Sequence, residues 1–149
     1  MDYICLDGPF GYLTVFAEND QITVLEFGRA PDPVETPLLR TARDQLAAYL
    51  QGKLTNFDLP LAPAGTPFQQ RVWDAMRRIP FGATRRYGDL AQELNSAARA
   101  VGGACGANPI PILIPCHRVL AAGGRLGGYS GGDGLPTKAA LLRLEGLSI

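Results

Sequence analysis

The segment Pro111-Ile112-Leu113-Ile114-Pro115-Cys116-His117-Arg118-Val119 decides how the rest of this sequence is interpreted. Its apolar run predicts a buried segment that ends at Pro115. A thiol, an imidazole and a guanidinium then follow in consecutive positions, and His117 is the only histidine of the chain. A cysteine at the end of a rigid apolar segment, beside a histidine that can take its proton, is a candidate nucleophile.

A direct contact between Cys116 and His117 is geometrically awkward. Neighbouring side chains point to opposite faces of a strand and lie about 100° apart on a helix. A bridging water or a bend at Pro115 would therefore be needed. The alternative is an inert core cysteine beside a hydrogen-bonded histidine, and two residues alone do not decide between these interpretations.

Length and composition allow one domain or two small ones, because 149 residues can bury a substantial core. The net charge is zero, but residues 1–65 carry four basic residues against nine carboxylates, whereas residues 66–149 carry ten against five. This asymmetry suggests that the second half faces nucleic acid, although ordinary solvated surfaces would also fit. Three widely spaced cysteines indicate a reducing compartment rather than a disulfide framework. With no signal peptide or membrane-spanning run in the sequence, we expect a cytoplasmic protein.

The first half predicts a small α/β domain over residues 1–62. Three short strands, 3–6, 12–18 and 21–27, are separated by turn residues and suggest an antiparallel meander. Thr36 caps a helix that runs to about Leu50, with Pro37 in its first turn. Cys5 is expected in the core, and residues 53–65 are interpreted as a linker.

The second half, residues 63–149, predicts mostly helices. Thr66, Pro67 and Gln69 form a capping box at the start of one helix, in which Trp73 is more readily a core residue than a stacking platform. Two short helices, about 87–94 and 97–105, are joined by a turn with Ser96 as N-cap, which is the helix-turn-helix pattern. A hairpin turn is expected at 121–124, and a final helix begins at Pro136.

The second helix of this pair lacks the side chains that read bases. Its residues are mainly alanine and glycine, and only Arg99 is equipped to enter a groove. Small residues would let the backbone lie close to DNA in a sequence-independent way, held by phosphates. Tight packing against another helix is the structural alternative for the same glycines.

The segment Ile114–Val119 resembles the acceptor-cysteine motif of the O6-alkylguanine-DNA alkyltransferases. Three further blocks match that family in order and spacing: Ala97–Gly103, Gly106–Pro109 and Tyr129–Gly132. The resemblance covers about residues 65–147. It implies an α+β fold, with an N-terminal ribonuclease H-like sheet and helix and a C-terminal, mostly helical winged helix-turn-helix domain. Some members hold zinc in the N-terminal domain with Cys and His ligands; since His117 is the only histidine here, we expect no metal and no cofactor.

The resemblance also implies residue roles. Cys116 would be the nucleophile, His117 its base through water, and Glu145 the partner that polarises His117. Asn108 would brace the turn before the active-site segment, and Tyr87 would donate to the leaving purine. Arg99 would fill the gap left by a flipped base. The remaining expected contacts are the substrate-binding residues Pro111, Val119, Tyr129, Ser130 and Gly131 and the DNA-binding residues Arg86, Ala97, Ala98 and Gly102.

These roles predict irreversible, stoichiometric transfer of the O6-alkyl group of guanine in double-stranded DNA to Cys116, with O4-alkylthymine as a second candidate substrate. We expect a monomer, with cooperative assembly on DNA left open. Arg86 stands where the family commonly has a small hydroxyl residue, and residues 133–136 are an insertion, so substrate range is undecided. The competing interpretations are a non-enzymatic helix-turn-helix or lesion-binding protein and a cysteine hydrolase. The first would lack an acceptor cysteine or carry base-reading side chains, and the second would need an oxyanion hole.

Overall fold

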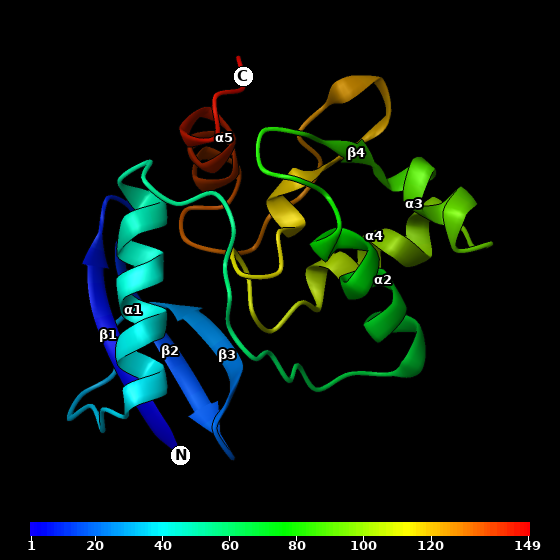
Figure 1. Cartoon of the computed structure of the whole chain (residues 1–149). Helices are drawn as coiled ribbons and strands as arrows, with labels where there is room; N and C mark the ends of the chain where they lie inside the picture. The colour runs from blue at the N-terminus through cyan, green and yellow to red at the C-terminus, as the bar shows by residue number, and fades with distance from the viewer. The chain divides into compact units, whose positions relative to one another are not determined.

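The computed structural model describes all 149 residues and divides into two compact units, Met1–Ala64 and Gly65–Ile149. Figure 1 shows strands and one long helix in the first unit and shorter helices with irregular segments in the second. This α+β architecture confirms the predicted fold class. No helix has both the length and the apolar character needed to cross a membrane.

The first unit is built on an antiparallel meander. Strands β1 (Asp2–Gly8), β2 (Gly11–Glu18) and β3 (Gln21–Phe27) pair in chain order, as predicted. The tight turn between β2 and β3 has positive φ angles at Asn19 and Asp20, two residue types that tolerate the left-handed region. Cys5 is only half-buried and contacts Thr14 Oγ1 at 3.3 Å, so the prediction of a core cysteine was wrong.

Helix α1 (Pro37–Leu50) packs against β1 and β2 and closes the core of this unit. The hydroxyl of Thr36 accepts a hydrogen bond from the Leu39 amide at 3.2 Å, which confirms the predicted N-cap. The apolar face of α1 is buried against the sheet through Leu39, Ala42, Leu46 and Tyr49.

In the second unit, helix α2 (Pro67–Arg77) begins with the predicted capping box between Thr66 and Gln69. Trp73 is only 1% exposed, and its indole nitrogen donates to the Ala104 carbonyl at 2.8 Å. Its assignment to the core is therefore confirmed.

Helices α3 (Tyr87–Glu93) and α4 (Ala98–Gly106) pack against each other as a helix-turn-helix. The N-cap of α4 is Ala97, not the predicted Ser96. Ser96 instead takes part in the C-terminal cap of α3, because its amide donates to the Ala91 carbonyl at 2.8 Å.

A two-rung ladder connects the helix-turn-helix to the segment after the Cys-His pair. Strand β4 (Arg85–Arg86) pairs in parallel with β5 (Val119–Leu120). The expected turn at 121–124 is present: the Ala121 amide donates to the Arg125 carbonyl at 2.8 Å, and residues Ala122–Gly124 form a short 3-10 element. It does not join a hairpin, because β5 pairs with β4. Helix α5 (Leu135–Leu144) then completes the unit.

Candidate active site

Cys116 opens a 3-10 helix, Cys116–Arg118, directly after Pro115. All residues from Ile112 to Leu120 are buried, and Cys116 is 8% exposed. The chain bends into this turn through a positive φ at Ile112 and a bridge between Pro111 and Ile114. The apolar run is thus buried, as predicted, and the thiol sits at the start of a tight turn rather than on a strand.

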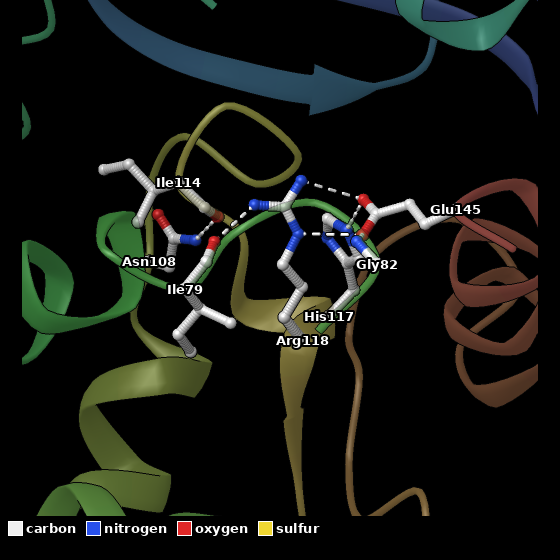
Figure 2. A network of polar contacts seen from close by, with 7 residues as sticks. All are labelled: Ile79, Gly82, Asn108, Ile114, His117, Arg118 and Glu145. Atoms are coloured by element: carbon white, nitrogen blue, oxygen red, sulfur yellow. Dashed lines mark hydrogen bonds and ion pairs between the residues drawn. The ribbon is translucent and has the colours of Figure 1, made fainter. Parts of the chain in front are cut away.

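The carboxylate of Glu145 binds the two residues that follow the thiol. Glu145 is the C-cap of α5 and is 4% exposed. Its Oε2 lies 2.7 Å from His117 Nε2 and 3.0 Å from Arg118 Nη2, and its Oε1 accepts from Arg118 Nε at 2.9 Å and from the Gly82 amide at 3.3 Å. Figure 2 shows these side chains converging on one carboxylate. A carboxylate that is costly at a helix C-terminus therefore has several compensating partners.

His117 is fully buried and is held as a neutral imidazole. Burial lowers its pKa below the usual value, and the bond to Glu145 opposes that shift without reversing it. A neutral ring that donates from Nε2 to Glu145 carries its lone pair on Nδ1. Nδ1 is therefore the atom of His117 that can accept a proton.

Asn108 and Lys138 set the surroundings of the thiol. Asn108 Nδ2 donates to the Ile114 carbonyl at 2.8 Å, and its Oδ1 accepts from the Ile110 amide at 3.0 Å, so the side chain braces the turn before Cys116. Burial raises the pKa of Cys116, whereas the Asn108 hydrogen bond and the positive charge of Lys138 lower it. Thiolate formation thus depends on groups that offset burial.

Lys138 is a functional candidate that sequence reasoning missed. It lies in α5, is fully buried, and donates from Nζ to the carbonyls of Val119 (2.7 Å), Leu126 and Gly128 (3.2 Å). Burial lowers its pKa, and interaction with Cys116 opposes this shift. Its sequence signal was weak, because a lysine in an amphipathic helix is ordinarily a solvated residue.

Two tyrosines lie in the same neighbourhood. Tyr87 begins α3 directly after β4, and the ammonium of Lys138 is 5.8 Å from its ring centroid. Burial raises the pKa of Tyr87 and of Tyr129, and each phenol also interacts electrostatically with Cys116. Both phenols therefore stay protonated at neutral pH and can act as hydrogen-bond donors.

The remaining predicted residues fall into an outer group and a pocket group. Arg86, Ala97, Ala98 and Arg99 are exposed at the start of α3 and α4, with Gly102 half-exposed. A Cβ added at Gly102 or Gly103 would meet nothing within 4 Å, so these glycines do not serve packing against another helix. In the pocket group, Val119 is buried, Pro111, Tyr129 and Gly131 are half-buried, and Ser130 is exposed.

Comparison with known proteins finds relatives that match nearly the whole chain. Residues 1–63 match the family described as 6-O-methylguanine DNA methyltransferase, ribonuclease-like domain, and residues 67–147 match its DNA binding domain. The chain belongs to the 6-O-methylguanine DNA methyltransferase family.

Individual members of this methyltransferase family are similar over their full length. The methylated-DNA–protein-cysteine methyltransferase of Methanosarcina acetivorans is 40% identical, covering 98% of this chain and 99% of that protein. The corresponding protein of Mycobacterium tuberculosis H37Rv is 45% identical, covering 96% and 91%. The crystal structure of Mycobacterium tuberculosis OGT in complex with DNA superposes with a TM-score of 0.87 at 45% identity, covering 97% of this chain and 92% of that one. The methyltransferase of Methanococcus jannaschii gives a TM-score of 0.71 at 29% identity.

Proposed function

We propose that this protein repairs DNA by transferring the O6-alkyl group of guanine to Cys116. The observation that carries the proposal is the buried sequence of thiol, imidazole and carboxylate, in which the only histidine is bound to Glu145 at 2.7 Å. This chain of groups can remove a proton from the thiol without exposing the site to bulk water. Family membership supports the same reaction.

In the proposed reaction the Cys116 sulfur attacks the alkyl carbon, a C–S bond forms and the C–O6 bond breaks. His117 Nδ1 takes the thiol proton through a bridging water, and Glu145 stabilises the resulting imidazolium. Tyr87 donates a proton or a hydrogen bond to the purine, which leaves with the electron pair of the broken bond. The one proton that the purine gains balances the one that the thiol gives to His117. Asn108 keeps the turn before Cys116 in place, as its bond to the Ile114 carbonyl suggests.

The guanine reaches the thiol only if the nucleotide leaves the base stack. We propose that Arg99 fills the gap that the flipped nucleotide leaves in the base stack, because its guanidinium is exposed near the start of α4. The open space around Gly102 and the small residues Ala97 and Ala98 would let the backbone of α4 approach DNA closely. Arg86 would contact phosphate.

The pocket for the flipped base would be lined by residues on both sides of the thiol. Pro111 would form one wall, and the main-chain carbonyl of Val119 would accept from the guanine amine. Tyr129, Ser130 and Gly131 would form the loop, with Ser130 near O6. This group fits because Tyr129 interacts electrostatically with Cys116.

The test is intact-protein mass spectrometry after incubation with an oligonucleotide duplex that contains one O6-methylguanine. We expect one added methyl group per protein molecule, mapped to Cys116, and no transfer by Cys116→Ala. Cys105→Ser is the matched control, because Cys105 is the other buried cysteine. It should still accept the methyl group. Lesion DNA that stays unchanged beside folded, reduced protein would refute the proposal.

The broader expectations follow from the same chemistry. The proposed reaction includes no step that regenerates the thiol from a thioether, so each molecule should act once. We also propose that the protein is a monomer. We propose the cytoplasm as its compartment, with the protein on the nucleoid when it is bound to DNA. Binding to undamaged duplex should weaken steeply as salt rises, with little sequence dependence.

A further inference from the structure

Arg118 is a buried arginine to which the proposed reaction gives no role. It is 6% exposed and uses its guanidinium in two directions. Nε and Nη2 bind the two oxygens of Glu145 at 2.9 and 3.0 Å, and Nη1 donates to the Ile79 carbonyl at 2.7 Å. Figure 2 shows the guanidinium between Ile79 and Glu145. Arg118 thus ties the residues that follow α2 to the end of α5.

The two hydrogen bonds from Arg118 restrict the orientation of the Glu145 carboxylate more than one bond could. A fork of two N–H groups fixes both the plane and the rotation of a carboxylate. With Arg118 and the Gly82 amide in place, Oε2 is directed at His117 Nε2, 2.7 Å away. The orientation of the imidazole therefore depends on a side chain that need not contact the substrate.

The contact between Arg118 and Glu145 also reduces the negative charge that acts on His117. A lone buried carboxylate beside an imidazole would draw a proton onto the ring, as an opposite charge at short range does. Here the carboxylate is already paired with a guanidinium, and Lys138 from α5 adds a second positive charge that acts on His117. From the segment after α2, the network receives the main-chain groups of Ile79 and Gly82, and the guanidinium carbon of Arg118 lies 6.0 Å from the centroid of the Phe81 ring.

We propose that Arg118 is a positioning residue of the acceptor site, which orients Glu145 and balances its charge so that His117 remains a neutral imidazole with Nδ1 ready to accept a proton. The inference rests on the proposed function, because only the neutral ring can take the proton of Cys116. It adds a fourth side chain to the thiol, imidazole and carboxylate.

The experiment uses nitrogen-15 NMR of the imidazole in the full-length, DNA-free protein. His117 is the only histidine, so its signals need no assignment. The wild-type ring should stay neutral, with the proton on Nε2, to below pH 6.5. In Arg118→Met the titration midpoint should rise by about one to three pH units, since a bare carboxylate remains. Arg118→Lys keeps the charge and should shift the midpoint less.

Arg78→Met is the matched control, because Arg78 forms an exposed ion pair with Glu93 at 3.1 Å and should leave the midpoint unchanged. An Arg118→Met midpoint equal to that of the wild type would overturn the proposal. If Arg118→Met does not fold, Arg118→Gln is titrated with the same criterion.

A second readout is the pH profile of alkyl transfer from O6-benzylguanine. The proposal expects the acid limb of the Arg118→Met profile to move to higher pH. A uniform loss of rate at all pH values would indicate a structural role alone and would count against it. Because the NMR titration requires no alkyl donor, its failure is distinguishable from failure of the repair function itself.

Discussion

The ion pair between Arg118 and Glu145 gives the sharpest prediction on stability. Both side chains are almost fully buried, and the pair is bidentate at 2.9 and 3.0 Å. Removing one partner of a buried pair leaves an uncompensated charge and costs about 3–5 kcal/mol. Glu145→Gln keeps the shape and one acceptor, so we expect a loss of about 3 kcal/mol. That is a large share of a total stability of about 5–15 kcal/mol.

A double-mutant cycle separates this charge effect from simple loss of packing. Arg118→Met keeps most of the aliphatic stem, and Arg118→Met with Glu145→Gln removes both charges. We expect the double variant to be more stable than the sum of the single effects predicts, by about 2 kcal/mol, measured by urea unfolding at constant m-value. Additive single effects would refute the reasoning, because they would mean that the two side chains do not compensate each other.

Three further predictions concern helix α4, the start of α2 and the imidazole. Gly103→Ala should stabilise the protein by about 0.5–1 kcal/mol in thermal unfolding, because the added Cβ meets open space. The same variant should bind duplex DNA more weakly in a salt titration. Unchanged binding would argue against a close approach of the α4 backbone to DNA. Gly65→Ala should destabilise by about 1–3 kcal/mol, since its Cβ would lie 2.4 Å from the Trp73 ring; a neutral effect on the urea midpoint would contradict this packing. Below pH 6.5 His117 binds a proton in the unfolded chain but stays neutral in the folded one, because burial lowers its pKa. The free energy of unfolding should therefore fall with decreasing pH, by up to about 1.4 kcal/mol per pH unit. His117→Gln should lose that part of the slope, and an identical slope in both proteins would show that the imidazole is not involved.

The local elements could be predicted from the sequence because their causes are local. Thr36 and Thr66 stand before proline and start helices through bonds to residues three positions on. The alternating strands of the first unit likewise carry their own turn signals. The ladder between β4 and β5 could not be predicted, because two residues on each side are too few to produce a pattern and the partners are 34 positions apart in the chain. Without that ladder, residues 121–124 were assigned to a hairpin.

Some residues of the site could be predicted from the sequence and others could not, because contacts between distant residues leave little local pattern. Cys116 and His117 are adjacent in the sequence, and Glu145 was expected through the family resemblance. Arg118 and Lys138 were missed because charged residues are ordinarily assigned to the surface, and only the folded chain reveals their burial. For Arg118 the available signal was its place between the apolar segment that ends at Pro115 and the apolar pair Val119-Leu120.

Lys138 holds the segment from Val119 to Gly128 entirely through main-chain carbonyls. A carbonyl is present whatever side chain its residue carries, so this anchoring is indifferent to most of the amino acids between those points. The exposed positions Ala122 and Arg125 can therefore be substituted, and contacts at the surface changed, without loss of the attachment to α5. The ammonium group of Lys138 thus fixes the position of the backbone of this segment without constraining its exposed side chains.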